Sequence, residues 1–146
     1  MSDFREVTGE FWASPQISPA DVAEAARLGC SMIINNRPEG ESDDQTSGDE
    51  IEQAAKALGL GYAAIPVTHA GFSAPQIDAM VAALDRAPGR VLAYCRSGTR
   101  STLLWSLAQA KLGRDLGAIA DAAAQAGYDV RPIAPLLEML AGSSAD

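Results

Sequence analysis

Short apolar runs alternate with helix-like stretches along the chain between residues 9 and 94. Four runs carry strand signals, because their apolar, aromatic or β-branched residues are bounded by turn residues. They lie at residues 9–14, 31–35, 62–67 and 91–94. Each intervening segment contains a serine followed three residues later by a side chain that can return its hydrogen bond, the pattern of a helix N-cap. These pairs are Ser18 with Asp21, Ser47 with Glu50, and Ser73 with Gln76. Strands separated by helices favour parallel pairing through helical crossovers.

Beyond residue 101 the strand signals stop. Residues 101–112, 115–126 and 135–141 suit helices, and Gly113 and Gly127 are placed to end the first two. We therefore predict an α/β fold with a central, mainly parallel sheet flanked by helices and a helical C-terminal part. A length of 146 residues is that of one ordinary domain, so residues 1–146 are expected to form a single domain.

The excess of acidic over basic residues limits which molecules the protein is expected to bind. With 19 acidic and 11 basic residues the net charge is −8. A nucleic-acid backbone or an anionic membrane surface would be repelled, so we expect neither as a partner. No apolar run is long enough to cross a bilayer, and the opening residues lack the basic flank and apolar middle of a secretion signal. A cytoplasmic location is expected.

The inventory of metal ligands is small. The chain has two cysteines, Cys30 and Cys95, and one histidine, His69. Two cysteines do not make a disulfide framework, and a reducing compartment would keep both as thiols. A tetrahedral metal site needs more cysteine or histidine ligands than these. We predict neither a metal nor a cofactor.

Cys95 directly follows the strand candidate at residues 91–94, and α/β sheets bind ligands beyond the carboxyl ends of their strands. The sequence "CRSGTR" would form a loop before a helix that begins near Ser101. Its small residues let backbone N–H groups turn inward, and the helix N-terminus adds positive potential. The sequence therefore predicts an anion cradle, whose candidate residues are Arg96, Ser97, Gly98, Thr99, Arg100 and Ser101.

The same surroundings bear on the reactivity of Cys95. The thiolate is the reactive form of cysteine, and cationic neighbours together with a helix N-terminus favour it. Arg100 can add a planar, bidentate grip on an oxyanion. We therefore predict that Cys95 is a nucleophile. The alternative is a small buried thiol at a strand end, with Arg96 and Arg100 merely solvated.

Four stretches in this order, "FWASPQIS", "INNRPEGE", "IPVT" and "AYCRSGTRSTLLW", carry a family resemblance. Over roughly residues 5–130, the chain resembles the phosphatase-like domain of beta-lactamase-hydrolase-like proteins. The resemblance implies the fold of tyrosine and dual-specificity phosphatases, and members have been described both as phosphatases and as sulfurtransferases. By position it implies Cys95 as nucleophile, Arg100 as the anion-gripping arginine and the amides of residues 96–100 as the cradle.

The length of the loop bears on the reaction. Related phosphatases have five residues between cysteine and arginine, whereas four separate Cys95 from Arg100, as in rhodaneses. A shorter loop has fewer inward amides, which suits a terminal sulfur better than a phosphoryl group. Tyr94 also stands where those phosphatases usually carry histidine. We therefore favour sulfur transfer through a Cys95 persulfide, from thiosulfate or a persulfide donor to an acceptor thiol, alongside a partner in persulfide oxidation.

The departing alkoxide of a phosphate ester needs a proton, which related phosphatases usually take from an aspartate. The corresponding stretch, "IPVTHAGFS" at residues 65–73, contains no carboxylate. Sulfur transfer has no alkoxide to protonate, so the missing acid also favours that reaction. His69 is an accessory candidate, since imidazole titrates near neutral pH, although a polar loop residue is the simpler interpretation. A phosphatase acting through phosphocysteine, and a non-catalytic anion-binding module, remain alternatives.

Further residues are weaker candidates. Arg37 follows a strand end and would assist the entry of an anion, but turn formation explains the Asn-Asn-Arg-Pro stretch nearly as well. The acidic run at residues 41–44 could offer carboxylates to the site, but such a run in a loop is usually solvated, and a solvated loop is expected here. Cys30 is expected to be a small buried thiol rather than a resolving cysteine. Trp12 and Trp105 are expected to pack in the core or over the site.

Overall fold

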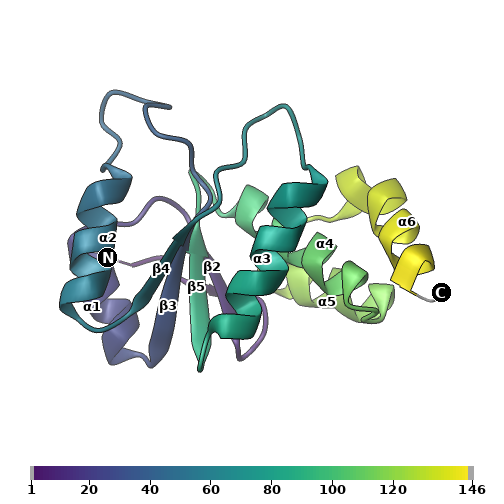
Figure 1. The fold of residues 1–146 in the computed structure, drawn as a ribbon, viewed down its shortest axis with the longest axis horizontal. Helices are drawn as coiled ribbons and strands as arrows, with labels where there is room; N and C mark the ends of the chain where they lie inside the picture. Colours follow the sequence, from purple (N-terminus) through teal and green to yellow (C-terminus); the bar gives the residue numbers. More distant parts are fainter. Residues whose placement is uncertain (1, 145–146) are drawn as a thin grey trace.

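The computed structural model describes residues 2–144 and is built around a five-stranded sheet (Figure 1). The strands lie in the order β1-β2-β5-β3-β4. β1 is antiparallel to β2, and the other neighbours are parallel. Their bounds are Arg5–Glu6 for β1, Phe11–Ser14 for β2, Cys30–Asn35 for β3, Gly61–Ala64 for β4 and Arg90–Tyr94 for β5. The predicted, mainly parallel sheet is confirmed, and β1 is an edge strand that the sequence pattern did not reveal.

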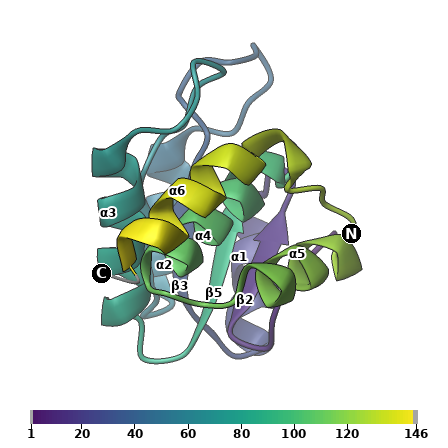
Figure 2. The same ribbon diagram turned by 90° about the vertical axis from the view of Figure 1, so that its right-hand side faces the viewer.

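Helices cover both faces of the sheet. α1 and α2 pack on one face and α3 and α4 on the other, while α5 and α6 lie outside α4 (Figures 1 and 2). The helix bounds are Pro19–Arg27 for α1, Gly48–Ala57 for α2, Ala74–Arg86 for α3, Thr99–Lys111 for α4, Leu116–Gln125 for α5 and Ala134–Ser144 for α6. A short 3-10 turn, η1 (Arg131–Ile133), precedes α6. The helical C-terminal part is therefore also as predicted.

The serine pairs begin the three helices for which they were predicted. The Ser18 hydroxyl accepts from the Asp21 N–H at 3.3 Å, and the Asp21 carboxylate accepts from the Ser18 N–H at 2.8 Å. The Ser47 hydroxyl accepts from the Glu50 N–H at 3.2 Å. At the third start, the Ser73 N–H donates to the Gln76 side chain at 2.8 Å. Each bond satisfies a backbone or side-chain group that a helix end would otherwise leave unpaired.

Two of the boundary shifts relative to the prediction affect the elements around Cys95. β4 ends at Ala64 and does not continue to residue 67, because Pro66 has no N–H to donate to a ladder. The chain still follows β3, since the N–H groups of Ile65 and Val67 donate to carbonyls at and just beyond the end of that strand. The second shift is in α4, which begins at Thr99 rather than near Ser101, so Arg100 and Ser101 belong to its first turn.

Two apolar clusters, one on each face of the sheet, form the core. The larger one surrounds α4, whose residues are buried from Ser101 to Ala108 and again at Ala110. α4 therefore has no solvent-facing side along most of its length, and this fixes the position of the loop that leads into it. Among residues 2–144, no helix has both the length and the apolar character that crossing a bilayer would require.

Candidate active site

Cys95 lies one residue beyond β5, at the carboxyl edge of the sheet. The connections at residues 36–47 and 65–73 rise from the same edge (Figure 1). The Cys95 sulfur accepts a hydrogen bond from the Gly98 N–H at 3.1 Å, and the residue is fully buried. At least one amide of the predicted cradle therefore points at the sulfur.

The turn between β5 and α4 is tight. Gly98 caps α4 in a left-handed conformation, with φ of 90°. Its carbonyl accepts from both the backbone N–H and the hydroxyl of Thr102, at 3.0 and 2.9 Å. The other predicted cradle residues, Arg96, Ser97 and Thr99, are exposed at the mouth of the turn. The sulfur thus sits beneath the N-terminus of a long buried helix, where positive potential favours an anion.

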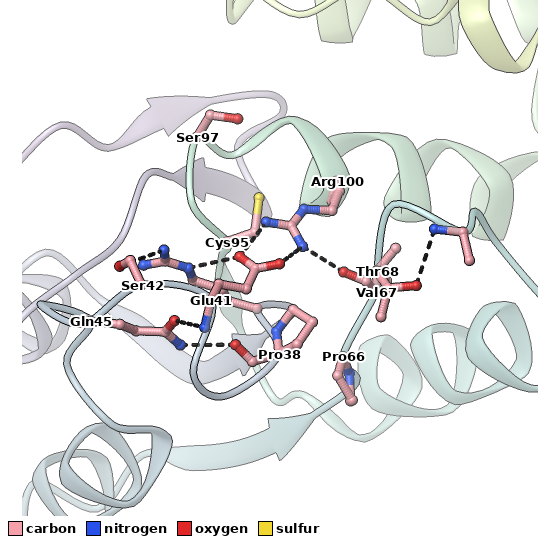
Figure 3. Close-up of polar contacts among 12 residues, drawn as sticks. Pro38, Glu41, Ser42, Gln45, Pro66, Val67, Thr68, Cys95, Ser97 and Arg100 are labelled. Atoms are coloured by element: carbon pink, nitrogen blue, oxygen red, sulfur yellow. Dashed lines mark hydrogen bonds and ion pairs between the residues drawn. The ribbon is translucent and has the colours of Figure 1, made fainter.

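Arg100 projects from the first turn of α4, and its guanidinium lies beside the Cys95 sulfur (Figure 3). Its Nη1 donates to Glu41 Oε2 at 2.7 Å and to the Val67 carbonyl at 2.6 Å, while Nη2 donates to Glu41 Oε1 at 2.9 Å. These hydrogen bonds to Glu41, together with the proximity of Cys95, raise the pKa of Arg100. The planar group is therefore held in one orientation next to the thiol.

Glu41 departs from the solvated interpretation of the acidic run and follows the alternative, a carboxylate offered to the site. The acidic run at residues 41–44 was predicted to be solvated, and Asp43 and Asp44 are indeed exposed. The Glu41 side chain instead turns inward and is only 17% exposed. Hydrogen bonds from Arg100, and then from Arg37, lower its pKa to about 2. The carboxylate is therefore ionised near neutral pH and bridges two arginines.

Arg37 corrects a second expectation, since its side chain is 4% exposed and is not free to receive an incoming anion. Its Nε donates to Glu41 at 2.9 Å, its Nη1 to Gln16 at 2.9 Å and its Nη2 to Ser42 at 3.2 Å. All three nitrogens of the guanidinium are bonded to protein groups. Arg37 therefore fixes the Glu41 carboxylate, which in turn orients Arg100.

The remaining predicted site residues are less engaged. The Ser101 hydroxyl is buried and has no hydrogen-bond partner within residues 2–144. His69 is exposed on the connection at residues 65–73, and no hydrogen bond or ion pair found in the described part of the chain joins it to Cys95 or Arg100. Its accessory role remains a prediction.

Cys30 and Cys95 lie at opposite ends of the parallel strands, Cys30 at the amino end and Cys95 beyond the carboxyl end. Cys30 opens β3, whereas Cys95 follows the end of β5, and the two strands are parallel neighbours. Burial raises the pKa of the Cys30 thiol to about 11. Cys30 is therefore an inert buried thiol, as expected, and is not placed to resolve a Cys95 intermediate.

The two tryptophans pack away from the site. Trp105 stacks on Phe11, and Trp12 packs beneath the Arg90 guanidinium. The packing alternative therefore holds for both. No group of three or more histidine, cysteine or acidic side chains within residues 2–144 is arranged to hold a metal ion.

Comparison with known proteins identifies the family. Residues 3–112 match the family described as beta-lactamase hydrolase-like protein, phosphatase-like domain. The chain belongs to this family. A beta-lactamase hydrolase-like protein of Xylella fastidiosa (strain Temecula1 / ATCC 700964) is 38% identical over 89 residues. That match covers 61% of this chain and 21% of the relative, so the chain spans about a fifth of the length of the curated relatives it matches.

Solved structures show the same fold for this phosphatase-like family member. One from Neisseria meningitidis Z2491, whose name provisionally assigns it to the phosphatases, superposes with a TM-score of 0.81 at 31% identity, over 93% of this chain and 96% of that one. TpbA of P. aeruginosa, as a cysteine-to-serine variant in complex with pTyr, gives a TM-score of 0.63 at 16% identity, over 95% and 88% of the two chains. The chain thus shares its fold with both of these solved structures.

Proposed function

We propose that the chain is a cysteine-dependent phosphatase that hydrolyses phosphate monoesters with acidic leaving groups, such as aryl phosphates. One observation carries the proposal: the Cys95 sulfur, the Gly98 N–H and the Arg100 guanidinium meet at the N-terminus of α4. The phosphatase-like family and the phosphatase fold favour this reaction over sulfur transfer, which the short loop and the absent general acid favoured. The phosphotyrosine bound to a structural neighbour is such a substrate.

The first chemical step is attack of the Cys95 thiolate on phosphorus. An S–P bond forms, and the P–O bond to the leaving group breaks with its electron pair on the departing oxygen. Arg100 and the inward amides neutralise charge on the phosphoryl oxygens. Water then attacks the phosphocysteine, the S–P bond breaks, and inorganic phosphate and the thiolate are released. The proton lost by water passes to solvent.

The choice of leaving group follows from the carboxylates near the site. Glu41 is ionised and bound to two arginines, so it orients Arg100 and holds no proton to give. Residues 65–73 contain no carboxylate. A phenol needs less protonation than an alkyl alcohol as it departs, so aryl esters are the substrates expected of this site. His69 would supply a proton only if its exposed loop closed over the substrate.

Sulfur transfer is a second candidate, favoured by one observation. Because α4 begins at Thr99, only residues 95–98 lie outside regular structure between β5 and the helix. In this reaction the Cys95 thiolate attacks the outer sulfur of thiosulfate, an S–S bond forms and sulfite leaves. An acceptor thiolate then takes that outer sulfur and regenerates Cys95. The acceptor thiol and a partner in persulfide oxidation belong to this candidate.

One comparison separates these reactions from mere anion binding. Wild type, Cys95→Ser and Cys30→Ser are each incubated with nitrophenyl phosphate and, separately, with thiosulfate before intact-protein mass spectrometry. The proposal expects release of nitrophenol by wild type and Cys30→Ser but not by Cys95→Ser. A Cys95-dependent gain of one sulfur atom without nitrophenol release would replace it with sulfur transfer. Neither signal, with phosphate still binding, would leave an anion-binding module.

A further inference from the structure

The peptide unit between Ser97 and Gly98 is held at both ends. Its N–H donates to the Cys95 sulfur at 3.1 Å, and its carbonyl oxygen accepts from the Tyr128 hydroxyl at 3.1 Å. A trans peptide is planar, with its N–H and C=O on opposite sides. A group that fixes the carbonyl therefore fixes the direction of the N–H as well.

Tyr128 is itself firmly anchored. It follows α5, and its backbone N–H donates to the Ala123 carbonyl at 2.9 Å. Its ring is part of the larger apolar cluster and is 7% exposed, with the Arg5 guanidinium 5.4 Å from the ring centroid. The hydroxyl thus reaches the turn from a fixed base, and its position is not set by the turn.

Gly98 and the Tyr128 hydroxyl fit together closely. A Cβ on Gly98 would overlap the Tyr128 oxygen, and the left-handed φ of 90° already disfavours any other residue there. The glycine therefore has two functions: it turns the chain into α4 and leaves room for the hydroxyl. This pairing joins the turn to a segment beyond residues 3–112, the part of the chain that matches the family.

We propose that Tyr128 is a positioning residue for Cys95, because its hydroxyl holds the Ser97–Gly98 peptide so that the N–H faces the sulfur. The helical C-terminal part then completes the anion site. The inference rests on the proposed role of Cys95 as nucleophile. It deepens that role by naming the group that orients the amide.

The test uses a substitution that keeps the ring. Tyr128→Phe removes only the hydroxyl, and Tyr62→Phe is the matched control, because the Tyr62 hydroxyl bonds to Asn35 on β3 and not to the turn. Alkylation of Cys95 by iodoacetamide is followed against pH by mass spectrometry of its peptide, with the Cys30 peptide as internal reference. Weakening of the hydrogen bond from the Gly98 N–H to the sulfur disfavours the thiolate. The Tyr128→Phe alkylation profile should therefore move to higher pH, with alkylation on its acidic limb slowed about threefold to tenfold.

A merely structural role for Tyr128 would lower the thermal midpoint without moving this profile. Profiles for Tyr128→Phe and wild type that superimpose would overturn the proposal. Hydrogen exchange of the Gly98 amide gives a second readout: it should accelerate in Tyr128→Phe and stay unchanged in Tyr62→Phe, and equal rates in all three proteins would also overturn it. Both readouts need only the thiol, so they stand even if wild type releases no nitrophenol and the proposed phosphatase activity fails.

Discussion

At the scale of single residues, the candidate site is a series of hydrogen-bonded charged side chains that leads to the Cys95 thiol. Arg37 fixes Glu41, Glu41 fixes Arg100, and Arg100 lies beside Cys95. Two hydrogen bonds join the planar guanidinium of Arg100 to one carboxylate, and a lysine cannot reproduce this geometry because its ammonium is a compact point charge. Orientation therefore matters here in addition to charge.

Arg100→Lys tests this orientation. We expect Cys95-dependent turnover of nitrophenyl phosphate to fall about a hundredfold or more, because the transition-state oxygens lose a preorganised bidentate donor. Steady-state kinetics measure the loss, and Arg27→Lys, on the exposed face of α1, should match wild type. Unchanged kcat/KM in Arg100→Lys would contradict a role for this guanidinium in the reaction.

Glu41 gives a pH-dependent prediction. Its pKa falls from 4.5 to about 2 in the folded protein, so its contribution to the free energy of unfolding is complete above the higher value and disappears as the pH falls toward the lower one. Glu41→Gln should be less stable than wild type near neutral pH and should lose less stability across this acidic interval. Urea unfolding at a series of pH values measures this difference.

The control for Glu41 is Glu52→Gln, which removes a carboxylate from a surface ion pair with Lys56 on α2. Such exposed pairs contribute little, about 0–1 kcal/mol, so this variant should follow the wild-type pH dependence. If the free energy of unfolding fell equally in wild type and Glu41→Gln as the pH dropped below the normal carboxyl pKa, the two arginines would not be holding Glu41 ionised.

Only some of these site residues could be predicted from the sequence. Cys95 and Arg100 could be found because both lie in one short segment whose composition and position after a strand are informative. Glu41 was only a weak candidate and Tyr128 was none, because they lie 59 and 31 positions in sequence from their partners at the turn. Local pattern describes a solvated acidic run and an aromatic residue after a helix, and only tertiary packing turns them toward the site.

At the scale of elements, local patterns were more informative. Helix starts were predictable because the serine caps satisfy orphan groups within three residues. The early start of α4 was not, because its cap is Gly98, a residue outside the serine cap pattern whose left-handed conformation only the fold reveals. The strand-turn-helix unit therefore depends on this one glycine.

Gly98→Ala tests this dependence against Gly59→Ala. Gly59 has a φ of 78°, and a Cβ added there would meet nothing within 4 Å, so its substitution should cost about 1–2 kcal/mol of backbone strain. Gly98→Ala adds an overlap with Tyr128 and should destabilise the protein further and abolish Cys95-dependent activity. Chemical unfolding and kinetics on both variants measure this; equal destabilisation with full activity in both would contradict the close fit.

At the scale of the whole molecule, α4 is an internal helix. The sheet and α3 cover one part of its surface, and α5 and α6 cover the rest (Figure 2). The sequence indicated three C-terminal helices but not that two of them enclose the first, because most sides of α4 are apolar or small and no face distinguishes the sheet from the other helices. The family match ends at residue 112, one residue beyond α4.

The segment that matches the family should therefore not fold stably without the C-terminal helices. Removing residues 113–146 would expose the outer side of α4 and delete Tyr128, so the remainder should show cooperative unfolding only weakly or not at all and should bind a hydrophobic dye.

A graded check stays within the full chain: Leu137→Ala, in buried contact with the core, should cost about 2–4 kcal/mol, whereas Met139→Ala, 60% exposed on the same helix, should cost much less. Circular dichroism and urea unfolding measure both experiments. A truncated chain that unfolds cooperatively at the full-length midpoint would show that the core is stable without α5 and α6. Equal destabilisation by Leu137→Ala and Met139→Ala would show that packing of α6 on the core does not contribute to stability.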